Sequence, residues 1–161
     1  MVEKNDFLRK VMRHWTTGVA VVSSAWDGQR HGLTANSLTS VSLEPPLVTV
    51  TLARSSRTHA LVEQSQVFGV SILAADQDEV AARFAGHGEW DDRFSGLEVF
   101  TLETGVPLLV GGLAHLDCRV EFHYPMPGST LFLGRAVAFR LMGDGQPLVY
   151  HQRKYYRGCY E

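Results

Sequence analysis

Gly32-Leu33-Thr34-Ala35-Asn36-Ser37 and Arg54-Ser55-Ser56-Arg57-Thr58-His59 are two polar segments on either side of an apolar run at residues 47–52. Threonines alternate with apolar side chains in this run, which predicts a strand with one buried and one polar face. The first segment supplies amide and hydroxyl groups, and the second supplies two guanidiniums. Together they predict a site for a flat ligand that is polar at one edge and phosphorylated at the other.

Short strands and tight turns dominate the rest of the chain. Residues 19–25 and 30–35 predict a hairpin around Asp27-Gly28, and helices are predicted at residues 7–15, 59–64 and 77–84, with Asp6 and Asp76 as N-caps. Further strands are predicted at residues 67–73, 97–102, 113–124, 131–141 and 148–151, and a loop at residues 86–94. About seven or eight strands with only short helices predict a mainly β chain, folded as a closed antiparallel barrel in a single domain over residues 1–161.

Charge and composition limit the partners that we expect. The formal net charge is -2 and no run of five like charges occurs, so the sequence predicts neither nucleic-acid binding nor membrane binding. No apolar segment of a signal peptide follows residues 1–6, which favours a cytoplasmic protein. Cys118 and Cys159 are too few for a disulfide framework and are expected to be reduced thiols.

Several familiar catalytic motifs are missing from the sequence. The seven histidines form no metal-binding pattern, so no metal site is predicted. No Gly-x-Ser-x-Gly, Walker or Gly-x-Gly-x-x-Gly motif follows a predicted strand, which argues against a hydrolase, a nucleoside triphosphatase and a Rossmann dehydrogenase. Redox chemistry in this chain would therefore need another scaffold.

Each of the two polar segments has two interpretations. Arg54 or Arg57 can hold a phosphate through paired N–H donors beside a helix N-terminus, or the segment is a solvated loop in which Thr58 caps the helix. Asn36 can donate to and accept from a planar heterocycle, with space left by Ala35, or residues 34–37 simply end a strand. Local sequence leaves these alternatives open.

The order of the motifs resembles the short-chain flavin reductases, the reductase components of two-component flavin monooxygenases. The resemblance covers nearly the whole chain, and its motifs follow the family's order. They are residues 16–22, 31–37, 40–48, 54–58, 68–73, 83–84, 92–94 and 147–151.

The resemblance implies an FMN-binding split β-barrel with Greek-key antiparallel topology. It also implies that NADH or NADPH passes a hydride directly to FMN or FAD, without a catalytic side chain. The reduced flavin then serves a separate flavin-dependent monooxygenase, and the reductase is expected to be a homodimer. By position, the resemblance assigns cofactor contacts to Thr34, Ala35, Asn36, Ser37, Ser40, Ser42, Leu52, Ala53, Arg54, Ser56, Arg57, Thr58, Phe84 and Arg93, and the nicotinamide side to Ser129, His151 and Tyr155.

One position departs from the family pattern. The family commonly has Gly-Asp-His before the late strand, whereas this chain has Pro127-Gly128-Ser129. Because that histidine is associated with nicotinamide binding in similar proteins, we expect Ser129 to weaken or redirect nicotinamide binding. The missing histidine leaves open a split-barrel protein that binds flavin without nicotinamide turnover. A second alternative to a reductase is an unrelated β-barrel binding module.

Overall fold

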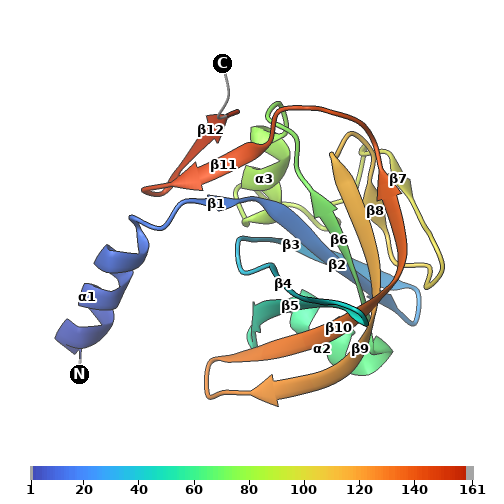
Figure 1. The fold of residues 1–161 in the computed structure, drawn as a ribbon, viewed down its shortest axis with the longest axis horizontal. Coiled ribbons are helices and arrows are strands. Elements are labelled where there is room, and N and C mark those ends of the chain that lie inside the picture. Colours follow the sequence, from blue (N-terminus) through green and yellow to red (C-terminus); the bar gives the residue numbers. More distant parts are fainter. Residues whose placement is uncertain (1, 159–161) are drawn as a thin grey trace.

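A seven-stranded antiparallel sheet forms the barrel of this protein (Figure 1), for which a computed structural model describes residues 2–158. The strands pair in the order β3-β2-β6-β9-β10-β5-β4, and the edge strands β3 and β4 do not pair with each other. The barrel is therefore open along one seam, so the prediction of a closed barrel from the strand pattern is wrong, whereas the split barrel that the family resemblance implies agrees with it. Its strands are β2 (Ala20–Trp26), β3 (Gln29–Ala35), β4 (Thr39–Leu43), β5 (Pro46–Ala53), β6 (Val67–Ile72), β9 (Ala114–Pro125) and β10 (Ser129–Leu141).

Strand β2 separates two hydrophobic cores. Ala20 and Val22 face the barrel interior, where the largest buried side chains are Phe68 and Phe132. Val21 faces the opposite way, into a second core that also contains Leu73, Phe84, Phe94 and Leu148. Burial on both faces explains why residues 19–22 are continuously apolar instead of alternating with polar residues.

Three helices lie among residues 2–158: α1 (Val2–Met12), α2 (Arg57–Ser65) and α3 (Asp78–Phe84). Helix α2 packs against β2 and β3, and α3 packs against β3. Helix α1 projects away from the barrel (Figure 1). None of the three has the length and apolar character needed to cross a bilayer.

Two small sheets complete the fold. Strands β1 (Thr17–Gly18), β11 (Leu148–His151) and β12 (Lys154–Arg157) pair in the order β1-β11-β12, and β7 (Val99–Phe100) pairs with β8 (Leu108–Leu109). The first of these sheets holds the end of α1, because the Gln152 N–H donates to the Arg13 carbonyl oxygen at 3.0 Å. The tip of the β11–β12 hairpin consequently lies beside the C-terminal end of α1 (Figure 1).

The structure confirms the mainly β fold with short helices and the predicted first hairpin. Asp27 and Gly28 have φ values of 48° and 73°, as a two-residue turn between antiparallel strands requires. In β5, Val48, Val50 and Leu52 are buried, whereas the threonines between them are only half-buried.

Several predicted boundaries are wrong. Helix α1 ends at Met12, not at residue 15, because residues 17–18 extend to pair with β11. Asp6 lies inside this helix and pairs with Arg9 at 3.2 Å instead of capping it. Asp76 does not cap α3, since Gln77 occupies the N-cap position.

Some strands were also predicted wrongly or missed. The strand expected at residues 97–102 is reduced to Val99–Phe100, and β1, β4, β8 and β12 were not predicted. All of these strands have two to five residues, which is too short for a clear alternating pattern, and β1 also has a distant partner in β11.

The buried thiol of Cys118 is free. Burial, together with the nearby charge of Asp117, raises the pKa of Cys118 to about 12, so the thiol stays protonated and is not a nucleophile. Cys159 lies outside the described residues.

Candidate functional site

The end of β3 and the β11–β12 hairpin line a small cavity, which we call the ring cavity. Its volume is about 170 Å³. Tyr150 and Tyr155 lie on paired positions of the hairpin, with ring centroids 5.6 Å apart. Burial, followed by the neighbouring Tyr150, raises the pKa of Tyr155, so its hydroxyl is neutral. The remaining lining residues are Val19, Thr34, Ala35, Asn36 and Ala85.

Asn36 is exposed and lies where three cavities meet. Besides the ring cavity, it lines a cavity of about 380 Å³ next to Trp15 and Thr16, and one of about 590 Å³ beside α1. Because an amide side chain both donates and accepts hydrogen bonds, Asn36 is suited to the polar edge of a flat heterocycle.

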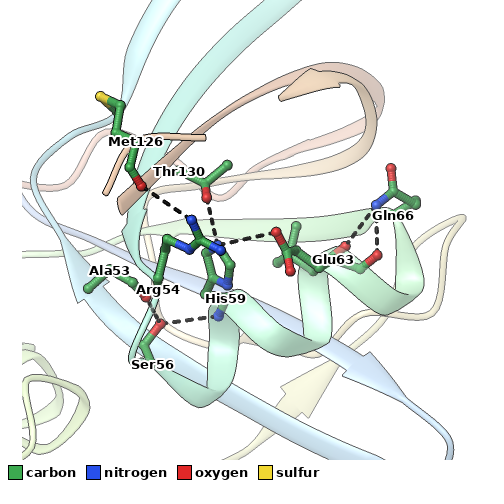
Figure 2. A network of polar contacts seen from close by, with 9 residues as sticks. Ala53, Arg54, Ser56, His59, Glu63, Gln66, Met126 and Thr130 are labelled. Carbon is green, nitrogen blue, oxygen red and sulfur yellow. Dashed lines mark hydrogen bonds and ion pairs between the residues drawn. The ribbon is translucent and has the colours of Figure 1, made fainter. Parts of the chain in front are cut away.

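The turn before α2 is organised by Ser56. Its Oγ accepts the His59 N–H at 3.1 Å and donates to the Ala53 carbonyl oxygen at 2.8 Å (Figure 2). Ser56, and not Thr58, is therefore the N-cap of α2. The partial positive charge at a helix N-terminus favours an anion such as phosphate at this end of α2.

Two buried histidines fix this turn to the barrel. Thr58 Oγ1 lies 2.8 Å from His31 Nδ1 on β3, and His59 Nε2 lies 2.7 Å from Thr130 Oγ1 on β10. Figure 2 shows the contact with Thr130. Burial, followed by the charges of nearby arginines, lowers the pKa of His31 to about 4, and burial also lowers the pKa of His59. Both imidazoles are therefore mainly neutral near pH 7, and they hold the start of α2 between two strands.

Arg54 and Arg57 flank the start of α2 on different sides. Arg54 Nη1 approaches the Met126 carbonyl oxygen at 3.5 Å, in the turn between β9 and β10 (Figure 2). Arg57 lines a separate cavity of about 340 Å³, together with Trp26 and Gln64. Both guanidiniums belong to exposed residues and remain accessible to a ligand.

The loop at residues 86–97 is attached to β3 and α3 by arginines. Arg93 Nη1 donates to the carbonyl oxygens of Phe84 at 2.8 Å and Gly32 at 3.1 Å. Arg30 Nη2 donates to Asp92 Oδ2 at 2.7 Å. Partial burial opposes ionisation of Asp92, but the hydrogen bonds from Arg30 and from the Phe94 N–H, together with the charges of Arg30 and Arg83, outweigh it and lower the pKa of Asp92. The loop is thus held in place by charged groups near the second core.

The structure brings the predicted flavin contacts together as two groups. Thr34, Ala35 and Asn36 line the ring cavity. Ser37 connects this group to β5, because its Oγ accepts the Thr51 N–H at 3.0 Å and donates to the Thr51 carbonyl oxygen at 3.1 Å. The second group surrounds the start of α2 and contains Ala53, Arg54, Ser56 and Arg57.

Other predicted contacts have side chains engaged elsewhere. Leu52 and Phe84 are fully buried in the two cores, so only their main chains can meet a ligand. The side chains of Thr58 and Arg93 make the internal hydrogen bonds described above. Ser40 and Ser42 lie on β4, and neither lines a cavity named above.

The three residues predicted for the nicotinamide side do not lie together within one chain. Ser129 pairs with Ala53 at the start of β10, next to the turn that begins α2. His151 and Tyr155 lie instead on the β11–β12 hairpin, where His151 Nδ1 is 2.8 Å from Thr16 Oγ1. Within one chain, Ser129 therefore lies in a different sheet from His151 and Tyr155.

Sequence reasoning missed Tyr150, Ala85 and His31. Tyr150 lies in the motif at residues 147–151, and recognising Gln152-Arg153 as a two-residue turn would have paired Tyr150 with Tyr155. No local signal distinguishes Ala85, which reaches the ring cavity only because α3 packs on β3. No cluster of three His, Cys, Asp or Glu side chains in the described part of the chain could hold a metal ion.

Comparison with known proteins identifies the family. The protein-family model described as "Flavin reductase like domain" matches residues 12–158 of the sequence. The chain belongs to this family. An NADH-dependent flavin reductase from Rhodococcus sp. is 40% identical over 147 residues, which cover 89% of this chain and 81% of that protein. The reductase subunit HsaB of a flavin-dependent monooxygenase from Rhodococcus jostii (strain RHA1) is 32% identical over 147 residues, covering 91% of this chain and 74% of that protein.

A solved structure has the same architecture. The NADH:FAD oxidoreductase SgcE6 of Streptomyces globisporus C-1027 matches with a TM-score of 0.90 and 32% identity, covering 97% of this chain and 94% of that chain. A second structure of SgcE6, in complex with NAD and FAD fragments, matches with a TM-score of 0.89. The family and the split-barrel fold predicted from the sequence are thereby confirmed.

Lowering the pH from about 6.5 to about 4 is expected to reduce the free energy of unfolding. His31 takes up a proton below pH 6.5 in the unfolded chain but only near pH 4 in the folded chain, so the unfolded state binds more protons in this interval. The expected loss is on the order of 2–3 kcal/mol. Urea unfolding of the wild type and of His31→Asn at pH 7 and pH 4.5 measures it.

His31→Asn is expected to lose most of this pH dependence. His87→Asn, in the exposed loop, is the matched control and should keep the dependence of the wild type. Identical pH dependence in the wild type and His31→Asn would contradict the assignment.

Proposed function

We propose that this protein is an NADH- or NADPH-dependent reductase of FMN or FAD that supplies reduced flavin to a separate monooxygenase. The observation that carries the proposal is the arrangement of the two groups of predicted contacts. A cavity bordered by Asn36 and two tyrosines is linked through Ser37 and β5 to a helix N-terminus flanked by arginines. The named relatives support the same activity, and HsaB supports a separate oxygenase as the partner.

The ring cavity and the adjoining cavity of about 380 Å³, which share Val19, Ala35 and Asn36, are placed to hold the flat part of a flavin together. Ala35 and Ala85 leave space beside the tyrosine rings, and Asn36 offers a donor and an acceptor to the polar edge of the ring. A bound flavin would accept the hydride, so the chain needs to supply orientation and exclusion of water, not an acid or base. The half-buried Tyr150 and Tyr155 are placed to exclude water.

The start of α2 fits the phosphate of the same ligand. Ser56 fixes the first turn, and His31 and His59 hold that turn against β3 and β10, so the N–H groups are preorganised. Arg57 adds a charge that can form paired hydrogen bonds to phosphate oxygens. Leu52 and Ala53 contribute main-chain atoms at the end of β5.

We also propose that the protein acts as a homodimer. Phe122 and Tyr124 are 58% and 59% exposed on β9, and they share one face of the sheet with their partners Leu133 and Leu131 on β10. Helix α1 carries an equally unpartnered apolar face. Monomeric proteins rarely expose such surfaces. In a dimer, Ser129 of one chain could lie near His151 and Tyr155 of the other, which one chain by itself keeps apart. The exposed apolar residues are Phe7, Leu8, Val11 and Met12 on α1 and Trp15 shortly after it.

We propose a cytoplasmic location for this activity, as the sequence predicts. The oxygenase that receives the reduced flavin is expected to be a separate polypeptide.

Aerobic oxidation of NADH and NADPH, followed by nicotinamide absorbance, tests the proposed reaction. We expect rapid oxidation that depends on added FMN or FAD. A sample that quenches flavin fluorescence but oxidises neither nicotinamide would overturn the reductase proposal in favour of a flavin-binding protein. A sample that does neither would overturn flavin binding as well as reduction, while the family membership, which excludes an unrelated barrel, would stand.

Arg57→Ala is expected to raise the dissociation constant of FMN, measured by flavin fluorescence quenching, by at least about tenfold. The reason is the loss of a charge-assisted hydrogen bond to phosphate, on the order of 1.5–3 kcal/mol. Riboflavin, which lacks the phosphate, should bind almost unchanged. Arg54→Ala is the matched comparison, because Arg54 flanks the same turn but lies toward Met126. Equal losses of affinity for FMN and riboflavin would show that Arg57 does not contact the phosphate.

Phe122→Glu is expected to convert a dimer into a monomer, because it would bury a carboxylate in an apolar interface. Light scattering coupled to size-exclusion chromatography measures the change in mass. Phe139→Glu is the control, since Phe139 is also 58% exposed but lies toward the other end of β10. A wild-type protein that elutes as a monomer with its flavin would show that the dimer proposal is wrong.

A further inference from the structure

A strongly basic groove lies between α1 and the tip of the β11–β12 hairpin. Its volume is about 590 Å³, and it adjoins the ring cavity because both are lined by Asn36 and Tyr150. Four cations line it: Arg9, Lys10 and Arg13 from α1, and Arg153 from the hairpin turn. We call this surface the basic groove.

The cations of the basic groove have little opposing charge. The carboxylate of Asp6 lines the groove and pairs with Arg9 at 3.2 Å. Among residues 4–158, whose side chains the structure describes, Lys10, Arg13 and Arg153 take part in none of the ion pairs. Like charges placed close together repel one another, and an anion bound between them would relieve that repulsion.

The cations come from two elements that are firmly joined. The Gln152 N–H donates to the Arg13 carbonyl oxygen at 3.0 Å, and Thr16 Oγ1 lies 2.8 Å from His151 Nδ1. Strand β1, which follows α1, also pairs with β11. The position of Arg13 relative to Arg153 is therefore set by hydrogen bonds close to both residues.

The hairpin turn that carries Arg153 is conformationally unfavourable. Gln152 and Arg153 form its two central residues and have φ values of 47° and 65°. Two-residue turns with positive φ strongly prefer Asn-Gly, Asp-Gly or Gly-Gly, and the first hairpin of this chain follows that rule with Asp27-Gly28. Strain at a side chain that lines a charged cavity is typical of a binding site.

We propose that the basic groove binds the diphosphate of a dinucleotide. The inference rests on the proposed function, which places a flat ring in the adjoining ring cavity. A ligand seated there would pass Asn36 and Tyr150 and extend its phosphates between Arg13 and Arg153. The diphosphate belongs either to the nicotinamide dinucleotide or to FAD, whereas FMN has none. If it belongs to FAD, the flavin phosphate of FAD lies in the basic groove and the start of α2 holds only the phosphate of FMN.

Binding measurements with matched ligand pairs test the proposal without turnover. The wild type and the double variant Arg13→Gln/Arg153→Gly are titrated calorimetrically with FAD and with FMN. They are then titrated with NAD⁺ and with nicotinamide mononucleotide in the presence of FMN. The double variant should bind at least one dinucleotide about tenfold more weakly and both mononucleotides within about twofold. If only NAD⁺ binds more weakly to the double variant, the groove is assigned to the nicotinamide substrate. If only FAD binds more weakly, the groove is assigned to the flavin.

Two further variants separate charge from folding. Arg153→Gly alone should weaken dinucleotide binding while the melting temperature stays equal or rises, because glycine adopts the positive φ without strain. Lys154→Gln removes a neighbouring charge that does not line the groove, and it should bind all four ligands like the wild type.

Three results would overturn the basic groove as a diphosphate site. They are unchanged binding of both dinucleotides by the double variant, equal losses for dinucleotides and mononucleotides, and no dinucleotide binding by the wild type. Failure of the proposed function is a different result, namely no flavin-dependent NADH or NADPH oxidation by the wild type.

Discussion

Burial of β2 on both faces is the constraint on which the rest of this structure depends. Val22 contributes to the barrel core and Val21 to the second core, and burying each side chain stabilises the fold by about 1.5–3 kcal/mol. Strand β3 pairs with one edge of β2 along its whole length. The position of β2 therefore sets where β3 ends, and with it where Thr34, Ala35 and Asn36 meet the β11–β12 hairpin.

The site itself is assembled across the open seam of the barrel. Ser37 connects the end of β3 to β5 on the far side of the seam, and His31 and His59 connect the start of α2 to β3 and to β10. The two histidine contacts are buried and the Ser37 contact is half-buried, so removing one partner would leave the other with an unmet hydrogen bond. They join the elements on the two sides of the seam.

Much of the fold was predictable because its signals are local. The alternation in residues 47–52 and the continuous apolar run at residues 19–22 reflect burial of neighbouring residues. The Asp27-Gly28 turn reflects the positive φ values that a two-residue turn requires. The turn that we propose for phosphate binding is also recognisable as Arg-Ser-Ser-Arg-Thr at residues 54–58, although the capping residue is Ser56 and not Thr58. Helix α1 was misplaced because its end depends on the pairing of residues 17–18 with β11, more than 130 positions away in the chain.

The sequence by itself determined the fold class, the family and the two polar segments from which the candidate site is built, because motif order and local periodicity are properties of neighbouring residues. Only the tertiary structure decided which side chains are available to a ligand. It placed Thr58, Phe84 and Arg93 in internal contacts, separated Ser129 from His151, and brought Arg13 and Arg153 to one groove. The physical reason is that availability depends on burial and on hydrogen bonds between distant segments, which no local pattern encodes.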